Sequence, residues 1–341
     1  MRAAALEVAG LSKEFHVRNS SGWGRRALRA VDDVSFAIPP GRTLGLVGES
    51  GCGKSTLGRM IVGLIPPTGG TIRLGGETVR ASRSAAERRG IQMVFQDPYA
   101  SLDPRMTIHE VVAEPLRING LYSAGKVDRL LTQVGLSPDA GQRRPAQFSG
   151  GQRQRIAIAR ALALDPRVLI LDEAVSALDV SIQAQIVNLL RRLQRDLGLS
   201  YLFISHDLSV VRHISDEVAV MYLGRIVESG PRAAVFGAPA HPYTQALLSA
   251  VPSVHRRDRT SRIVLEGDLP NPLDRPEGCV FRSRCFKAAP RCATEAPALA
   301  ALDGDHRAAC HFAEPTPRDR LARLAPADRP EEKTASKEDH P

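Results

Sequence analysis

A glycine-rich run at residues 48–56 limits what this chain can fold into more than any other stretch of its sequence. The run reads Gly-Glu-Ser-Gly-Cys-Gly-Lys-Ser-Thr and fits the pattern G-x-x-x-x-G-K-[ST]. An apolar strand is predicted just before it, over 43–47, and a helix just after it, over 54–64. In such a strand–loop–helix unit, backbone N–H groups of the loop and of the helix N-terminus surround a chain of phosphates. This context favours a nucleotide site over a glycine turn with a surface lysine.

The residues of this run have distinct expected roles. Lys54 supplies a positive charge to the outer phosphates, and the Ser55 hydroxyl is a ligand for Mg²⁺. Cys52 needs only to be small. The predicted nucleotide-binding residues are Gly48, Glu49, Ser50, Gly51, Cys52, Gly53, Lys54, Ser55 and Thr56.

An acidic pair follows a second apolar run. Residues 168–171 predict a buried strand, and Asp172 and Glu173 come directly after it. On its own, such a pair would more often mark the end of a strand. Together with a phosphate loop, the pair predicts that Asp172 holds Mg²⁺, directly or through water, and that Glu173 is the general base.

Two more polar residues end predicted strands. Gln96 follows the strand over 91–95, and His206 follows the strand over 201–204. Proteins with parallel sheets place ligands at the carboxyl ends of the strands. We therefore expect Gln96 to reach Mg²⁺ or the attacking water, and His206 to contact the γ-phosphate and orient the base.

Strand and helix signals alternate along most of the chain, which predicts an α/β fold with a largely parallel sheet. Between about 97 and 165 the strand signals fade, which predicts an inserted helical subdomain. Residues 218–227 predict a hairpin that turns at Gly224, and 242–250 a short helix.

Changes in composition divide the chain into three parts. We expect one nucleotide-binding domain over 1–251, with a β-rich subdomain at its N-terminus, and a small cysteine-containing appendage over 252–315. Residues 316–341 are charged and poor in apolar side chains, so we expect a disordered tail there.

Composition limits where the protein can act and which partners it can bind. The N-terminus has no apolar core of a secretory signal, and the apolar runs are far shorter than the roughly 20 residues that span a bilayer. Any pore must therefore come from other chains. The net charge of +9 fits either a polyanionic or acidic membrane partner, or simply a solvated arginine-rich surface.

A second anion site is predicted at Phe148-Ser-Gly-Gly-Gln152, where a glycine-rich segment begins a helix. Such a helix end presents free N–H groups and a positive dipole. Because the first loop already serves one nucleotide, we expect this segment to contact a nucleotide held by another subunit. The residues concerned are Ser149, Gly150, Gly151 and Gln152.

In this order, the motifs resemble those of ABC (ATP-binding cassette) ATPases, over about residues 5–250. The resemblance implies a P-loop NTPase cassette with Walker A at 48–55, Walker B at 168–173, and a D-loop that ends at Asp179. It also implies a head-to-tail dimer, in which each ATP lies between one subunit's Walker A and the other's signature segment. Phe15, or alternatively its neighbour His16, is expected to stack on adenine.

Two residues depart from the family's commoner pattern. Phe148 begins the signature segment where leucine is commoner, and Ala174 follows the acidic pair where proline is commoner. Neither change touches the chemistry directly, so we expect ATP turnover to survive.

The run after Gln96, Asp-Pro-Tyr-Ala-Ser-Leu-Asp-Pro-Arg-Met, resembles the second ATPase of dipeptide and oligopeptide importers. His241-Pro-Tyr-Thr-Gln-Ala-Leu-Leu-Ser-Ala-Val-Pro resembles them too. The resemblance implies a paralogous ATPase or a second copy as partner, two membrane permease subunits, an external binding protein, and a place on the cytoplasmic face of the membrane. The permease is expected to dock just after Gln96. Importers of nickel or glutathione belong to the same group and remain alternatives.

Two other functions fit parts of this sequence. A soluble ABC ATPase acting on nucleic acid would fit the positive charge, but one cassette without heptad repeats disfavours it, so no specific nucleic-acid partner is expected. A nucleotide sensor without turnover would be expected to lack some catalytic residues, whereas all are present here.

Four of the five cysteines crowd near the end of the chain, at Cys279, Cys285, Cys292 and Cys310. An odd total without an export signal argues against a disulfide framework. Four thiolates suit an iron–sulfur cluster or Zn²⁺, although the spacing is not that of a usual zinc finger. The resemblance to peptide-importer ATPases, some of which carry such a cluster, favours [4Fe–4S] over zinc or metal-free cysteines.

Overall fold

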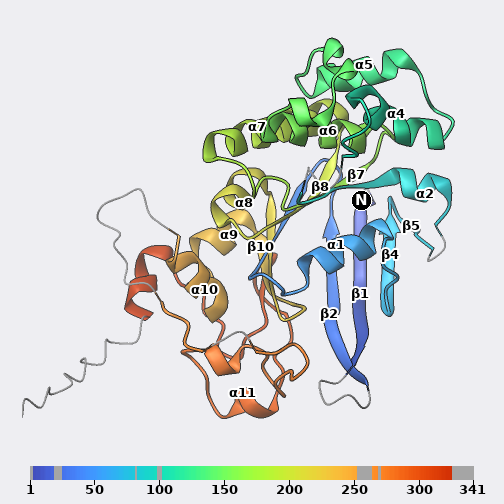
Figure 1. The fold of residues 1–341 in the computed structure, drawn as a ribbon. Coiled ribbons are helices and arrows are strands. Elements are labelled where there is room, and N and C mark those ends of the chain that lie inside the picture. Colours follow the sequence, from blue (N-terminus) through green and yellow to red (C-terminus); the bar gives the residue numbers. More distant parts are fainter. Residues whose placement is uncertain are drawn as a thin grey trace, which may run out of the picture.

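The computed structural model describes residues 3–18, 25–80, 83–97, 102–251, 263–267 and 270–324. Its centre is an eight-stranded sheet with the strand order β11-β12-β10-β9-β3-β8-β7-β6. A four-stranded antiparallel sheet, in the order β2-β1-β4-β5, lies beside it (Figure 1). The smaller sheet consists of β1 (Leu6–Arg18), β2 (Arg25–Ile38), β4 (Gly69–Leu74) and β5 (Glu77–Thr78).

The middle of the large sheet is parallel. Its strands are β6 (Ile91–Val94), β7 (Val168–Asp172), β8 (Ser200–Ser205), β3 (Thr43–Val47) and β9 (Glu217–Tyr222). Strands covered on both faces read as continuous apolar runs, which is why the sequence located four of them within one residue at either end. The predicted hairpin is also confirmed, since β10 (Arg225–Pro231) returns antiparallel to β9 after Gly224.

Alternate residues of β7 belong to two different hydrophobic cores. Leu169 and Leu171 belong to the core shared with the helical part of the molecule. Val168 and Ile170 belong to the core shared with the small sheet and with α1 (Lys54–Val62), which the sequence predicted. The carboxyl end of β7 is thereby fixed between two packed layers.

The described chain between 102 and 162 is helical and has no strand, in agreement with the predicted insertion of helices. It forms the upper lobe in Figure 1, with α4 (Ile108–Ile118), α5 (Ala124–Gln133), η1 (Pro138–Gln142), η2 (Pro145–Gln147) and α6 (Gly150–Leu162). Thr107 starts α4 with a capping box, in which its hydroxyl accepts the Glu110 N–H and the Glu110 carboxylate accepts the Thr107 N–H. Three further helices surround the sheet, α2 (Ala85–Gly90), α7 (Val180–Leu197) and α8 (Leu208–Ile214).

The C-terminal region joins the main sheet rather than standing apart from it. After α9 (Arg232–Gly237) and α10 (Pro242–Ser249) come η3 (Arg282–Arg284), α11 (Arg291–Thr294), β11 (Ala300–Asp303) and β12 (His306–Ala308). β12 pairs antiparallel with β10, and this pairing covers an edge that would otherwise be open. The buried Glu228 of β10 accepts hydrogen bonds from the N–H groups of Ala240 and His241. Its carboxylate also lies 2.7 Å from His306 Nε2.

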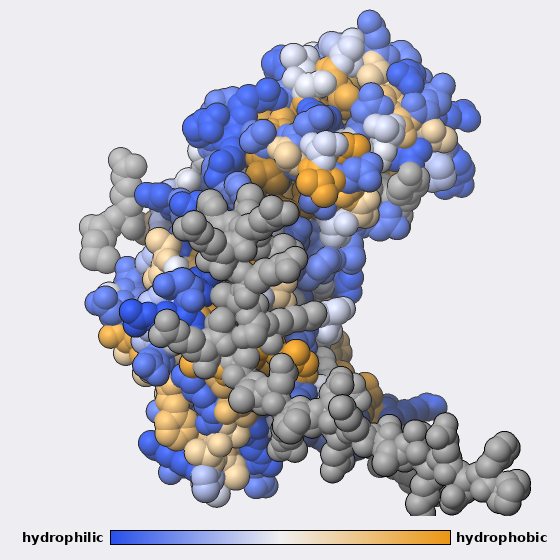
Figure 2. Space-filling model, turned by 90° about the vertical axis from the view of Figure 1, so that its left-hand side faces the viewer, coloured by the Kyte–Doolittle hydropathy of each residue, from blue (hydrophilic) through white to orange (hydrophobic). Residues whose placement is uncertain are grey.

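The first residues of the predicted disordered tail, which was expected to start at residue 316, are ordered. Arg318–Leu324 forms a short 3₁₀ helix, and Leu321 is buried because it packs into the main core. Residues 325–341 of the predicted tail lie outside the described residues. Within the described part, no helix is long and apolar enough to cross a membrane. The face seen in Figure 2 is largely hydrophilic, and small apolar patches are most evident on the upper helical lobe.

Candidate functional site

A cleft of about 690 Å³ lies over the carboxyl ends of the parallel strands and reaches the small sheet. Its volume is in the range of small-molecule sites. Predicted residues from five separate stretches of the chain meet there. The lining residues are Phe15, Leu28, Ala30, Ser50, Gly51, Gly53, Lys54, Ser55, Thr56, Gln96, Glu173 and His206.

The glycine-rich loop closes tightly in front of α1. Gly53, at the N-cap, has φ +108°, and a Cβ there would collide with the carbonyl oxygen of Ala30. Only glycine fits both the backbone conformation and the contact. The Lys54 ammonium donates to the carbonyl oxygens of Gly48 at 2.8 Å and Glu49 at 2.9 Å. The lysine is thus held across the loop, beside the N-terminus of a helix that favours anions.

Ser55 and Asp172 come together although 117 residues separate them. The Ser55 hydroxyl donates to Asp172 Oδ1 at 2.9 Å. Burial raises the pKa of Asp172, and the neighbouring Glu173 adds to this effect. A hydroxyl and a buried carboxylate are oxygen ligands of the kind that Mg²⁺ takes, and a cation would favour the ionised carboxylate.

Glu173 is held from both sides. Gln96 Nε2 donates to Glu173 Oε2 at 2.8 Å, and His206 Nδ1 lies 3.3 Å from Glu173 Oε1. The Glu173 backbone has φ +48°, a left-handed conformation that is costly for a non-glycine residue. Its N–H donates to the Ile204 carbonyl at 2.9 Å, so neighbouring β8 stabilises the turn. The three predicted catalytic side chains therefore form one connected group.

The far end of the cleft is formed by the long β1–β2 hairpin. Phe15 pairs with Leu28 across the two strands, and both line the cleft. The Lys13 ammonium lies 5.0 Å from the centre of the Phe15 ring. His16, the alternative to Phe15, does not line the cleft. Leu28 and Ala30 were not predicted from the sequence, although their period-two spacing on one strand was a usable signal.

Other predicted residues lie outside the cleft. Gly48, Glu49 and Cys52 belong to the loop but do not line it. Cys52 is buried, which raises the pKa of its thiol, and the Glu49 carboxylate turns towards Arg284 at 2.9 Å.

The signature segment also lies away from this cleft, at the N-terminus of α6. The Ser149 hydroxyl accepts the Gln152 N–H, and the Gln152 side chain accepts the Ser149 N–H. A Cβ at Gly151 would strike Ile182 of α7, so the glycine allows the two helices to approach closely. Asp179 is the N-cap residue of α7 and lies outside the cleft as well.

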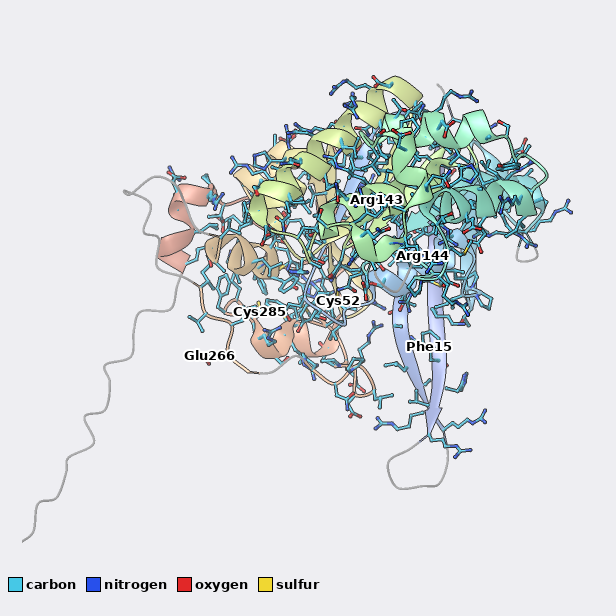
Figure 3. All side chains as sticks on the ribbon, turned by 45° about the horizontal axis from the view of Figure 1, so that its top comes forward. Phe15, Cys52, Arg143, Arg144, Glu266 and Cys285 are labelled. Atoms are coloured by element: carbon cyan, nitrogen blue, oxygen red, sulfur yellow. The ribbon has the colours of Figure 1, made fainter. Side chains whose placement is uncertain are left out.

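The two departures from the commoner family pattern are both accommodated by burial. Phe148 is 4% exposed, and the guanidinium carbon of Arg143, labelled in Figure 3, lies 4.5 Å from the centre of its ring. Stacking of this kind stabilises a cation over an aromatic face. Ala174 is also buried, directly after Glu173.

The four C-terminal cysteines are gathered in the appendage as free thiols. Cys279 and Cys292 are buried, and the Cys279 N–H donates to the Cys292 carbonyl at 2.9 Å. Burial raises the pKa of Cys285 to about 12, and the charges of the other three cysteines add to this effect. Among the described residues, no three His, Cys, Asp or Glu side chains are close enough to hold a single metal ion.

Comparisons with known proteins agree with the geometry. The model of the ABC transporter family matches residues 31–176, and that of the oligopeptide/dipeptide transporter C-terminal region matches residues 227–292. The oligopeptide transport ATP-binding protein AppF of Bacillus subtilis (strain 168) is 50% identical over 320 residues, covering 90% of this chain and 97% of AppF. The di/tripeptide transport ATP-binding protein DppF of Pseudomonas aeruginosa (strain UCBPP-PA14) is 49% identical over 316 residues, covering 91% of this chain and 98% of DppF.

A solved structure is similar as well. That of cbiO1 from Clostridium perfringens, described as part of the ABC transporter complex cbiONQ, matches with a TM-score of 0.58 and 29% identity. The match covers 69% of this chain and 91% of cbiO1.

Proposed function

Because this chain belongs to the ABC transporter family and is one of its ATP-hydrolysing subunits, we propose that it energises the import of dipeptides or oligopeptides. The observation that carries the proposal is the likeness to peptide-transport relatives over nine-tenths of the chain. That likeness includes the C-terminal region over residues 227–292, which lies beyond the predicted ATP-binding and catalytic residues.

The positions of the cleft residues support a separate role for each of them in ATP binding and hydrolysis. We assign Lys54 to the outer phosphates. Its ammonium would leave the two backbone carbonyls that it contacts here and bind the phosphates instead. Ser55 and Asp172 would hold Mg²⁺, which neutralises the charge of the phosphates. Phe15 would stack on the adenine ring, with Leu28 beside it.

We assign the general base to Glu173. Its carboxylate would accept the proton of the attacking water, since it lies in the cleft and is oriented by hydrogen-bonding side chains. Gln96 and His206 hold one carboxylate oxygen each, which keeps the base in a fixed orientation. This arrangement supports positioning roles for both, and does not require that either one takes the proton.

A partner ATPase would complete the site. Ser149, Gly150, Gly151, Gln152 and Asp179 lie outside the cleft of their own chain. We propose that they contact the nucleotide held by a paralogous ATPase or a second copy of this chain. The bare N–H groups at the start of α6 suit the γ-phosphate of that nucleotide.

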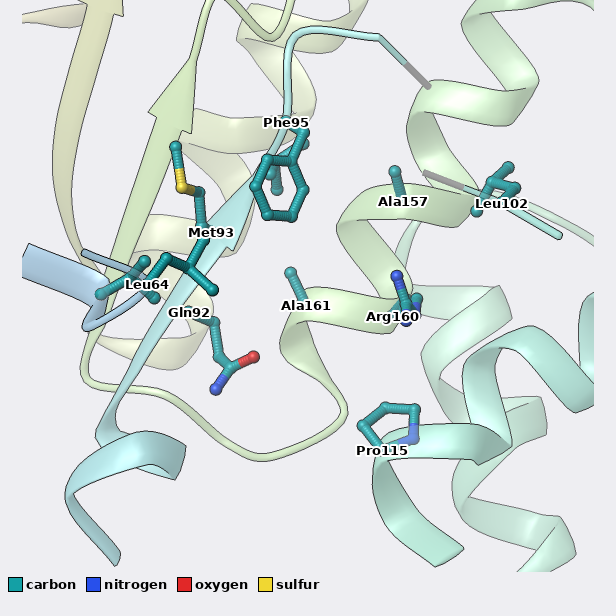
Figure 4. Close-up of a pocket in the computed structure, with 11 residues that line it drawn as sticks. Leu64, Gln92, Met93, Phe95, Leu102, Pro115, Ala157, Arg160 and Ala161 are labelled. Carbon is teal, nitrogen blue, oxygen red and sulfur yellow. The ribbon is translucent and has the colours of Figure 1, made fainter. Parts of the chain in front are cut away.

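The permease would dock in a groove between the sheet and the helical lobe (Figure 4). The groove is lined by Phe95, just before Gln96, and by Leu102 after it, whereas residues 98–101 of the predicted docking run lie outside the described residues. Phe95 faces Ala157 and Ala161 of α6 across the groove. Leu64 on its rim is 59% exposed. A groove lined mainly by apolar side chains, with Gln92 and Arg160 among them, suits an amphipathic helix of a membrane subunit. Through this contact the chain would lie peripherally on the cytoplasmic face of the membrane.

The four C-terminal cysteines are the residues that would hold an iron–sulfur centre. They are free thiols gathered in one appendage, although no three of the described ones are close enough to hold a single metal ion. Thiolates are the ligands that such a centre takes. The Phe312 N–H already donates to Cys310 Sγ at 3.3 Å, a contact that stabilises a cluster-bound thiolate. We propose that Cys279, Cys285, Cys292 and Cys310 hold a [4Fe–4S] centre, which in this position would tie the appendage together.

The proposal is tested by isolating the tagged chain from gently solubilised membranes of its own organism under anaerobic conditions. We expect a second ATPase, two membrane subunits and a peptide-binding protein to be recovered with it, and four iron atoms per chain. Recovery of a nickel- or glutathione-binding protein would reassign the cargo. Recovery of soluble partners or nucleic acid only would contradict a role in transport.

A further inference from the structure

The cysteine-bearing appendage touches the phosphate-binding loop directly. Arg284 immediately precedes Cys285, and its Nη1 lies 2.9 Å from Glu49 Oε2 in the loop. The Arg284 side chain is only 10% exposed, so solvent screens this ion pair weakly. Figure 3 labels Cys285 and Cys52, which lie on the two segments that this ion pair joins.

The backbone of the same loop residue is held from the same side. The Glu49 N–H donates to the Tyr243 hydroxyl at 2.9 Å. The Tyr243 ring packs on Phe281 of the appendage, with ring centres 5.4 Å apart. Phe281 is fully buried between Cys279 and Cys285 in the sequence. Both the backbone and the side chain of Glu49 thus depend on how the cysteine segment is packed.

This ion pair also matters for the charge around the nucleotide. The Glu49 carbonyl is one of the two that hold the Lys54 ammonium. Without Arg284, the Glu49 carboxylate would be an unneutralised negative charge in a loop that has to accept a polyphosphate.

The junction is not fully hydrogen-bonded. Arg284 Nε and the Tyr222 hydroxyl are buried close to each other, yet neither has a hydrogen bond of good geometry to any described residue. Buried polar atoms without partners are costly, so a small shift of η3 that paired them would be favourable. Tyr222 is thus a second neighbour, besides Glu49, through which the packing of η3 bears on Arg284.

We propose that Arg284 is a positioning residue that couples the cysteine-bearing appendage to the phosphate-binding loop through Glu49. The inference rests on the proposed function, since it assumes that the loop binds ATP. Packing of the segment around its four cysteines sets the position of Arg284, and Arg284 in turn sets the affinity of the loop for ATP.

The first test is equilibrium ATP binding to the full-length chain, purified anaerobically, with EDTA present to prevent turnover. We expect Arg284→Gln to raise the Kd about tenfold, which corresponds to about 1.4 kcal/mol. Glu49→Gln/Arg284→Gln should return it close to the wild-type value, because the repelling charge is gone. A merely structural role of Arg284 would give no such rescue. Arg291→Gln is the matched control, because Arg291 pairs with Glu295 on the surface of the same appendage.

The second test asks whether the cysteines act through this pair. Cys285→Ser should raise the Kd for ATP in the wild-type background and leave it unchanged in the Glu49→Gln/Arg284→Gln background. An equal effect in both backgrounds, or no effect in either, would overturn the coupling, as would wild-type affinity of Arg284→Gln. Failure of the wild-type chain to bind ATP would instead overturn the proposed function.

Discussion

At the scale of single residues, Glu173 is the side chain on which turnover should depend most. We expect Glu173→Gln to lower the rate of ATP hydrolysis by about 10²- to 10⁴-fold, the usual contribution of a general base. ATP binding should persist, because Lys54 and Ser55 are untouched. Steady-state phosphate release together with nucleotide binding measures both. Glu295→Gln, a surface glutamate of the appendage, is the control. Wild-type turnover in Glu173→Gln would remove Glu173 as the base.

A buried histidine should make stability depend on pH. Burial lowers the pKa of His241 from 6.5 to about 4 in the folded chain. As the pH falls below 6.5, the unfolded chain takes up the proton first, so the free energy of unfolding decreases until about pH 4. The loss attributable to His241 would be about 3 kcal/mol.

Denaturant unfolding at pH 7.5 and pH 5 measures this effect. His241→Asn keeps an acceptor for the Tyr243 N–H and cannot titrate, so its pH dependence should be weaker. His213→Asn, an exposed histidine, should keep that of the wild type. An equal loss of unfolding free energy between pH 7.5 and pH 5 in all three chains would contradict the role of His241.

The sequence predicted the residues that form contiguous motifs and missed those that only folding brings together. Lys54, Ser55 and Glu173 were predicted from patterns with a known chemical logic, and all three side chains lie at the cleft. No local pattern indicated that Tyr243 or Arg284 contacts Glu49, because they reach it from 194 and 235 residues away. Their contacts follow from the docking of the appendage.

At the scale of elements, burial and length explain which strands could be predicted from the sequence. Strands buried on both faces were visible as apolar runs. By contrast, β11 and β12 at the end of the sheet have only four and three residues, too few to show a pattern in the sequence. The long strands β1 and β2 have mixed burial patterns and register shifts, which blur the alternation that sequence reasoning depends on. Only a β-rich N-terminal part could be predicted there.

The docking of β12 on β10 should contribute strongly to stability. We expect His306→Ala to lower the free energy of unfolding by about 2 kcal/mol or more, because it leaves the fully buried Glu228 carboxylate without its partner side chain. Chemical denaturation at neutral pH measures the change. His311→Ala is the control, since its ring lies near the surface and contacts a backbone carbonyl and the neighbouring Phe312 ring rather than a buried charge. A loss of less than 0.5 kcal/mol, the usual scale of a surface substitution, would contradict this account.

At the scale of the whole molecule, the helical lobe and the sheet enclose the groove that we assign to the permease. We expect Leu64→Asp to abolish recovery of the membrane subunits from solubilised membranes, because it places a charge on the exposed apolar rim. Leu197→Asp is the control, at a residue that is 44% exposed at the end of α7 and does not line the groove. Equal recovery with both variants would place the permease elsewhere.

The central claim, that ATP turnover in this chain drives peptide import, is tested most directly by transport. The measurement is uptake of a labelled tripeptide into proteoliposomes that contain the purified complex, with Mg-ATP on the side of this chain and the peptide-binding protein on the other. We predict ATP-dependent uptake with the wild-type chain and none above background with Glu173→Gln. Uptake that is unaffected by Glu173→Gln, or its absence for every peptide length tested while ATP is still hydrolysed, would contradict the account.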